Sequence, residues 1–155
     1  MDQNMEYRQR LVQEYRQTVT PLLRYLPWFE EKKGQPGSSL YHGDDFTEHS
    51  MSFPVYDSTL LAFVREASRT SLMDRNYRYV YTRNRIRTPE DERRVIAAAD
   101  LREWDILCGI LSKYVLGGMT KGSLWSQAVQ ENIFYLVLSK MKEIIEFWDK
   151  PLDSR

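Results

Sequence analysis

Five side chains of metal-ligand type lie close together in the N-terminal half of the chain: His42, Asp44, Asp45, Glu48 and His49. Imidazole and carboxylate groups together can hold zinc or another divalent ion. Their spacing matches no established metal motif, and they fall in a stretch crowded with Gly, Pro, Ser and Asp. We therefore predict solvated loop residues here, with no bound metal and no other cofactor.

Two weaker candidates lie further along the chain. Gly117–Ser123 precedes a predicted helix and contains Lys121, so its backbone could bind an anion. It lacks the preceding strand and the Lys-Ser/Thr pair of a phosphate-binding loop, which favours an ordinary turn between helices. Cys108 lies on the apolar stripe of its predicted helix, as is typical of a buried structural thiol. As the single cysteine it excludes an intrachain disulfide.

The stretch from Arg69 to Arg87 has the most informative polar pattern. It holds six arginines against one acid, Asp74, with three tyrosines between them. Guanidinium groups pair with phosphate, and tyrosine rings stack on unpaired bases. Arginine and tyrosine are also the residues that anchor protein interfaces. The candidate binding residues, for a protein partner or for nucleic acid, are Arg69, Arg75, Arg78, Tyr79, Arg83, Arg85 and Arg87.

Three interpretations of this stretch stay open. In the first, the arginines form a solvated face while Tyr77 and Tyr81 share the core side of a helix, with Arg78 and Arg85 together on another side. In the second the stretch binds a protein, and in the third it binds nucleic acid. Because the chain has a net charge of zero, it lacks the basic excess of most nucleic-acid binders, which favours a protein partner over nucleic acid.

These residues must be positioned by a helical scaffold. Apolar residues recur at helical spacing from Leu11 to Leu26, where Pro21 predicts a kink or a new helix and Pro27 predicts the end. Residues 34–52 predict a long irregular loop. Asp57 and Thr88 are the predicted N-caps of two helices, one before and one after the arginine-rich stretch. Asp74 is the predicted N-cap of a short helix within the stretch.

The C-terminal half has the clearest periodicity. A helix follows Asp100 and ends at Gly117–Gly118. A single long helix is then predicted over residues 124–148, with Trp125 and Trp148 at its ends and a broad apolar face. Together these patterns predict one all-α domain over residues 1–155, a bundle of five or six helices with few strands.

Composition narrows the class of protein. A chain of 155 residues with 42% hydrophobic and 28% charged residues is in the globular range. The sequence has no run of about 18 apolar residues, the length that a membrane-spanning helix needs. The N-terminus is polar, so we expect no signal peptide. We expect a cytoplasmic protein without a membrane partner. Positions 65–94 carry nine basic and five acidic residues, so the basic excess is local.

One further pattern links the chain to a family. The chain resembles a bacterial domain-of-unknown-function family, number 6508, over about residues 53–145. The likeness is carried by Phe53–Tyr56, Leu60, Leu61, Phe63, Leu72–Asp74, Tyr77, Ala99–Leu101, Ile110, Leu111, Gly122, Trp125, Ala128, Ile133, Phe134 and Leu138. Leu116–Lys121 stands where the family has an Arg-Gly-Glu-Arg-Phe-like segment. The resemblance implies a helical fold and no known catalytic residues; such families are scattered through bacterial, phage and conjugative-element genomes.

The expected function is binding without catalysis. Signatures of serine hydrolases, kinases and dinucleotide-binding enzymes are absent from the sequence, so we predict that the protein is not an enzyme. We predict a protein-binding or regulatory domain encoded by a phage or mobile element, such as an inhibitor of a bacterial defence nuclease. The alternative is a nucleic-acid-binding accessory protein that uses the Arg69–Arg87 stretch. A homo-oligomer is compatible with the many tyrosines and tryptophans.

Overall fold

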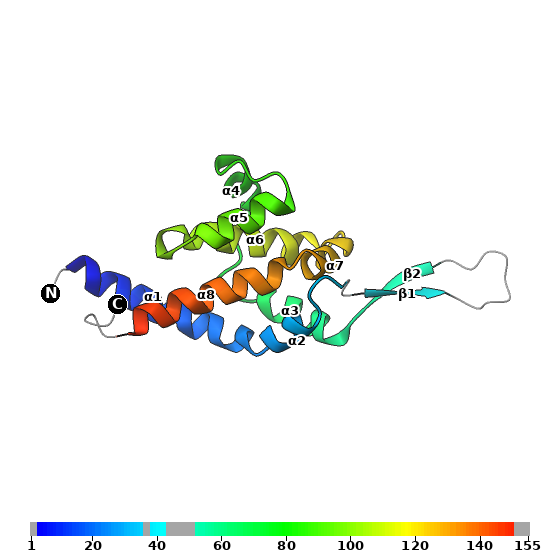
Figure 1. The fold of residues 1–155 in the computed structure, drawn as a ribbon, viewed down its shortest axis with the longest axis horizontal. Coiled ribbons are helices and arrows are strands. Elements are labelled where there is room, and N and C mark those ends of the chain that lie inside the picture. The colour runs from blue at the N-terminus through cyan, green and yellow to red at the C-terminus, as the bar shows by residue number, and fades with distance from the viewer. Residues whose placement is uncertain (1–2, 36–37, 43–51, 151–155) are drawn as a thin grey trace.

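The computed structural model describes residues 3–35, 38–42 and 52–150. This part of the chain contains eight α-helices, one 3₁₀ helix and one β-hairpin (Figure 1). The elements in chain order are α1 (Gln3–Leu23), α2 (Leu26–Glu31), β1 (Ser38–His42), β2 (Ser52–Tyr56), α3 (Ser58–Ser68), α4 (Tyr77–Arg83), α5 (Pro89–Ala98), the 3₁₀ helix η1 (Leu101–Glu103), α6 (Trp104–Gly117), α7 (Ser123–Gln130) and α8 (Ile133–Asp149). The predicted helical bundle is confirmed, but five or six helices are too few, because both terminal segments are divided.

Prolines mark the division of the N-terminal segment. Pro21 lies in the last turn of α1, which ends two residues later at Leu23. The prediction that Pro27 ends the segment is wrong, because Pro27 lies in the first turn of α2. A proline is tolerated there since its missing N–H would have no partner within the helix. The short α2 that follows places Phe29 in the core.

The division of the C-terminal segment corrects the prediction of one helix over residues 124–148. Helix α7 ends at Gln130, and α8 begins at Ile133 after Asn132, which has a φ of 67°. Asparagine adopts this left-handed conformation more readily than most residues, and it interrupts the ladder of helical hydrogen bonds. Trp125 and Trp148 therefore belong to two different helices.

The predicted irregular loop over residues 34–52 is also only partly right. Ser38–His42 and Ser52–Tyr56 pair as antiparallel strands, with Leu40 opposite Pro54 in the register. The hairpin extends from one end of the bundle, while the start of α1 and the end of α8 lie at the opposite end (Figure 1). At its base, the Tyr56 ring packs edge-on against Trp125 of α7, with ring centroids 5.5 Å apart.

Two of the three caps predicted around the arginine-rich stretch are confirmed. The prediction that Asp74 caps a helix is wrong, because α4 begins after Asn76 and the Asp74 carboxylate accepts a hydrogen bond from the Asn76 N–H instead. At α3, the Asp57 carboxylate accepts a hydrogen bond from the Thr59 N–H at 2.8 Å. At α5, Thr88 and Asp91 cap each other's backbone N–H groups in a reciprocal capping box, and Pro89 occupies the first turn. Each such cap stabilises a helix start by about 1 kcal/mol. The stretch between them is thereby anchored at both ends.

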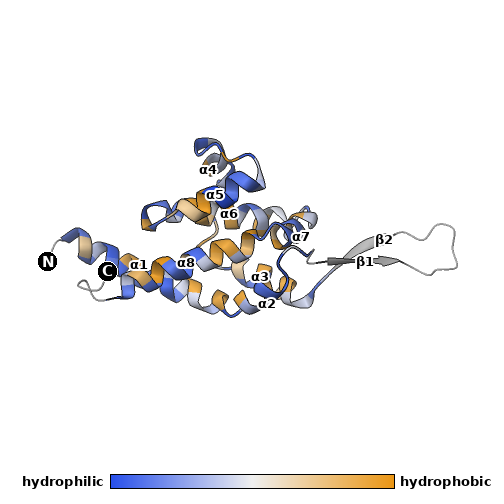
Figure 2. Ribbon diagram, in the orientation of Figure 1, coloured by the Kyte–Doolittle hydropathy of each residue, from blue (hydrophilic) through white to orange (hydrophobic). Residues whose placement is uncertain are grey.

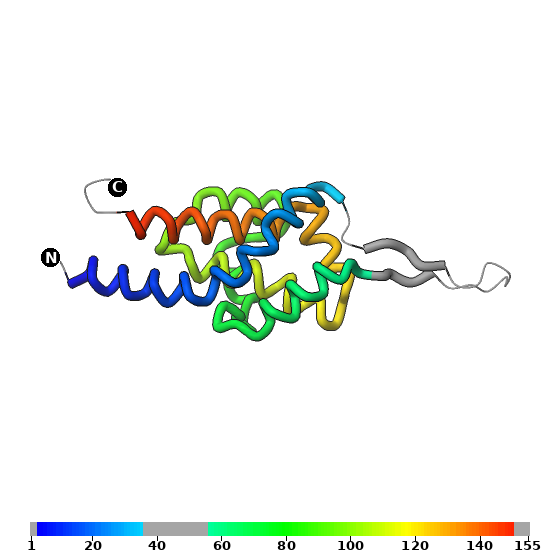
Figure 3. Tube along the Cα trace, turned by 90° about the horizontal axis from the view of Figure 1, so that it is seen from below, coloured from blue at the N-terminus to red at the C-terminus, as the bar shows by residue number. Residues whose placement is uncertain are grey.

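Helix α8 lies at the centre of the bundle. It contacts α1, α2, α5, α6 and α7, and it runs antiparallel beside α1 (Figure 3). Both of these long helices carry hydrophobic and hydrophilic residues, as expected of helices with one face in a core (Figure 2). Within the described residues, no helix has the length and apolar character needed to cross a bilayer.

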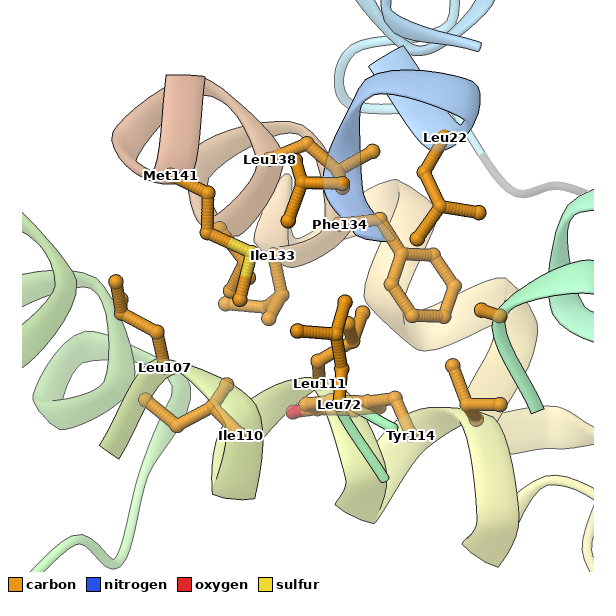
Figure 4. Packing of buried hydrophobic residues seen from close by; sticks show 14 of the residues in the cluster. Leu22, Leu72, Leu107, Ile110, Leu111, Tyr114, Ile133, Phe134, Leu138 and Met141 are labelled. Atoms are coloured by element: carbon orange, nitrogen blue, oxygen red, sulfur yellow. The ribbon is translucent and has the colours of Figure 1, made fainter. Parts of the chain in front are cut away.

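An aromatic cluster occupies the middle of the core. The Phe134 ring of α8 is within 5.0 Å of the Phe63 ring and within 5.6 Å of the Phe29 ring, measured between centroids. Tyr114 of α6 approaches Phe134 edge-on at 6.2 Å. Leucine and isoleucine side chains of α6 and α8 fill the space around these rings (Figure 4). The core therefore joins helices from both ends of the chain.

Candidate functional site

The seven candidate residues of the arginine-rich stretch all lie at the surface. We call them the arginine surface: Arg69, Arg75, Arg78, Tyr79, Arg83, Arg85 and Arg87. Arg69 caps the C-terminus of α3, and Arg75 lies in the connection before α4. Three members lie on α4, namely Arg78, Tyr79 and Arg83, and Arg85 and Arg87 lie between α4 and α5. Tyr79 is 57% exposed, a large value for an aromatic side chain between charged neighbours.

Charge pairing distinguishes these arginines from others in the molecule. Within the part of the chain that the structure describes, none of the six has a carboxylate within ion-pair distance. Four arginines elsewhere do have such partners: Arg16, Arg24, Arg93 and Arg94. Without an ion pair among the described residues, these guanidinium groups are available to an external anion.

Helix α4 is seated on α6 through a close backbone approach. Val80 of α4 lies directly over Gly109 of α6, where an added Cβ would come within 2.7 Å of a Val80 methyl group. Beside this contact the Ser112 hydroxyl of α6 accepts a hydrogen bond from the Asp74 N–H at 2.8 Å. Tyr77 and Tyr81 are half-buried on the same side of α4, as predicted.

One detail of the predicted arrangement is wrong. Arg78 and Arg85 do not share a helical face, because α4 ends at Arg83 and Arg85 has a φ of 56°. This left-handed residue redirects the chain so that Ile86, which is buried, enters the core. Arg85 and Arg87 consequently project from a turn rather than from a helix. Sequence periodicity gave no sign of this turn.

A hollow of about 580 Å³ adjoins the arginine surface. Tyr79 and Arg83 of α4 line it together with Arg102 of η1, so that two arginines face the same space. Asp74 and Asp105 line it as well. The hollow thus offers both signs of charge beside an exposed aromatic ring. Arg102 and Asp105 were not predicted as neighbours of this stretch, because they come from a different part of the chain.

Cys108 lies in the wall of this hollow, and its chemistry can be tested. Burial, with Asp105 and Asp74 nearby, raises the pKa of the thiol to about 12. Since the thiolate is the nucleophile, we expect Cys108 to react slowly. Alkylation by iodoacetamide near neutral pH should be at least about a hundredfold slower in the folded protein than in urea-unfolded protein. Equal rates in the two states would contradict a protected thiol and reopen a catalytic role for it.

The remaining candidates provide no second site. Residues 117–123 form the turn between α6 and α7 with backbone hydrogen bonds of their own, including the Lys121 N–H to the Gly117 carbonyl at 3.0 Å. Asp44, Asp45, Glu48 and His49 lie outside the described residues, as does the side chain of His42. Among the residues that are described, no group of three or more His, Cys, Asp or Glu side chains could hold a metal ion.

A comparison of the chain with protein-family models, with curated proteins and with solved structures gives no match. The class that the fold and the site define is therefore a helical bundle with an exposed arginine surface. Its function is inferred from its own residues.

Proposed function

We propose that this chain is a binding protein that acts without catalysis, through contact between the arginine surface and an acidic protein partner. The observation that carries the proposal is the exposure of all six arginines, together with Tyr79, without a carboxylate partner among the described residues. Arginine and tyrosine dominate the energetics of protein interfaces because they combine a large contact area with directed hydrogen bonds.

The hollow beside α4 favours a protein partner over nucleic acid. Asp74 and Asp105 line it next to Arg83 and Arg102. A phosphate backbone that passed over Tyr79 would meet these carboxylates and be repelled by them, whereas a protein can present charges of both signs. The zero net charge of the whole chain also provides no long-range attraction for a polyanion.

The particular role we propose is inhibition of a bacterial defence nuclease by a cytoplasmic protein of a phage or mobile element. The small size of the chain and its exposed binding surface support this role. The channel of a nuclease that holds nucleic acid is positively charged, so it would repel the arginine surface. The inhibitor would therefore dock on an acidic region outside that channel and leave DNA binding intact while blocking cleavage.

Charge reversal tests the protein-binding proposal. We expect the double variant Arg78→Glu, Arg83→Glu to lower the affinity for the partner at least about tenfold, as loss of interface arginines does. The measurement is affinity purification from nuclease-treated bacterial lysate, followed by titration of the identified protein. Arg10→Glu with Lys121→Glu makes the same change in net charge at exposed positions on other elements. Equal capture by both double variants would contradict the proposal.

Nucleic-acid binding is the second candidate, because Tyr79 is exposed between Arg78 and Arg83. An exposed ring flanked by guanidinium groups is the arrangement that stacks an unpaired base. Its sign would be retardation of a single-stranded oligonucleotide of about 20 nucleotides at low salt, with an affinity that falls steeply as salt is added. Tyr79→Ala should then weaken binding. An oligonucleotide that is never retarded would exclude this candidate.

A further inference from the structure

A carboxylate is buried directly beneath α4. Glu92 of α5 is only 1% exposed. One of its oxygens, Oε2, accepts a short hydrogen bond from the hydroxyl of Tyr81 on α4. The other, Oε1, accepts a hydrogen bond from the Tyr114 hydroxyl of α6 at 2.6 Å. A single side chain thus joins three helices, and one of the three carries most of the arginine surface.

A cation completes the cluster. Nζ of Lys113 is 3.4 Å from Glu92 Oε2 and lies 4.8 Å from the ring centroids of both Tyr81 and Tyr114. The negative charge of Glu92 is therefore balanced although it is out of contact with water. A buried carboxylate with every oxygen satisfied is stable as long as its partners stay in place, and removing one of them leaves a costly unpaired group.

Helix α4 otherwise rests on α6, where Val80 is seated on Gly109 and the Asp74 N–H donates to the Ser112 hydroxyl. The helix is only seven residues long, too short to be stable by its own hydrogen bonds. Its N-cap residue, Asn76, makes no side-chain capping bond. The hydrogen bond from Tyr81 to Glu92 links α4 to α5, and a hydrogen bond to a charged carboxylate is stronger than one between neutral groups.

We infer that Glu92 is a positioning residue for the arginine surface: it holds α4 on α5 and α6 and thereby fixes the geometry of Arg78, Tyr79 and Arg83. This inference rests on the proposed function. Glu92 itself contacts no partner. Loss of its bond to Tyr81 should free α4 while the core around α8 stays folded.

Hydrogen exchange measured residue by residue by NMR tests the positioning role. The amides of Asn84 and Ile86, which donate to the Val80 and Tyr81 carbonyls, report on α4. In Glu92→Gln and in Tyr81→Phe we expect them to exchange about tenfold to a hundredfold faster, as loss of a hydrogen bond to a charged group predicts. Their exchange should depend only weakly on urea at low concentration, because a local opening of α4 exposes little surface, whereas exchange of the Leu138 amide in the core depends steeply on urea because it needs global unfolding.

Two matched variants serve as controls. Glu90→Gln removes the same charge from an exposed position in the same helix. Tyr114→Phe removes a hydroxyl bonded to Glu92 but leaves the Tyr81 bond in place. Both should leave the exchange of Asn84 and Ile86 close to that of the wild type. Unchanged exchange of these two amides in Tyr81→Phe, or an exchange as steeply dependent on urea as that of Leu138, would overturn the inference.

Binding of a synthetic glutamate-rich peptide with interspersed lysines, which presents charges of both signs to the arginines and to Asp74 and Asp105, provides the functional readout and separates the two proposals. We expect both Tyr81→Phe and the Arg78→Glu, Arg83→Glu variant to bind this acidic polypeptide at least about threefold more weakly, whereas Glu90→Gln binds like the wild type. If charge reversal has no effect, the proposed function fails. If charge reversal weakens binding but Tyr81→Phe and Glu92→Gln do not, the positioning role of Glu92 fails alone.

Discussion

Phe134→Ala is expected to remove about 3–5 kcal/mol from the free energy of unfolding, as truncation of a buried phenylalanine does. The Phe134 ring is fully buried and touches the rings of Phe29, Phe63 and Tyr114. These three come from α2, α3 and α6, so the cavity would open where the two halves of the chain meet. Because domains of this kind are stable by only about 5–15 kcal/mol, the loss would be a large part of the total.

The measurement is urea-induced unfolding followed by tryptophan fluorescence and far-UV circular dichroism. Phe147→Ala is the matched control, because Phe147 lies on the same helix but is 45% exposed. Its loss should cost less than about 1 kcal/mol. If both substitutions lowered the free energy of unfolding equally, Phe134 would not face the core of the bundle as described. The central position of α8 would then be contradicted.

Local signals predicted much of the scaffold. Asp57 and Thr88 cap the helices that they were expected to cap, and Gly117 ends α6 at the predicted place. Such signals are readable because a cap is a contact between residues only two or three positions apart. The stripe from Leu107 to Val115 lies in the core for a similar reason: helical periodicity records which face is apolar.

The predictions that failed depend on single backbone conformations or on distant contacts. The apolar face of α7 continues into α8, so the pattern shows no break at Asn132, where one left-handed residue ends the first helix. Two-residue alternation is visible only over Phe53–Tyr56 in β2, and without a similar pattern in β1 the sequence does not predict the pairing of Leu40 with Pro54. Arg85 also has a positive φ and redirects the chain, and no sequence pattern predicts this conformation.

The residues of the arginine surface could be predicted from the sequence, but the buried residue that holds α4 in place could not. Six arginines against one acid are visible in the sequence, and the exposure of all six follows from the cost of burying guanidinium groups. Glu92 was missed because it follows Glu90 and Asp91 in the first turn of α5, where carboxylates are usually solvated. Only the packing of α4 and α6 against this turn shows that Glu92 is buried.

Burial of the tyrosines that contact Glu92 predicts that the protein loses stability at alkaline pH. Burial raises the pKa of Tyr81 and of Tyr114 above the ordinary value of 10, with Glu92 as a further cause, and burial raises the pKa of Tyr15 to about 12. Above pH 10 the unfolded chain loses these protons while the folded chain keeps them. The folded state then binds more protons, so the free energy of unfolding falls as pH rises. Below pH 10 this contribution to stability is fully present.

The slope approaches about 1.4 kcal/mol per pH unit for each such tyrosine above its unfolded pKa, so Tyr81 and Tyr114 together remove roughly 2 kcal/mol between about pH 10 and pH 11. Tyr114→Phe should be less stable than the wild type at about pH 8, because it lacks the hydrogen bond to Glu92. By about pH 11 the difference between the two proteins should shrink by about 1.4 kcal/mol, since the variant has one proton fewer to lose. Urea unfolding at both pH values measures this difference. A Tyr114→Phe slope equal to that of the wild type would show that Tyr114 is not held protonated beneath α4.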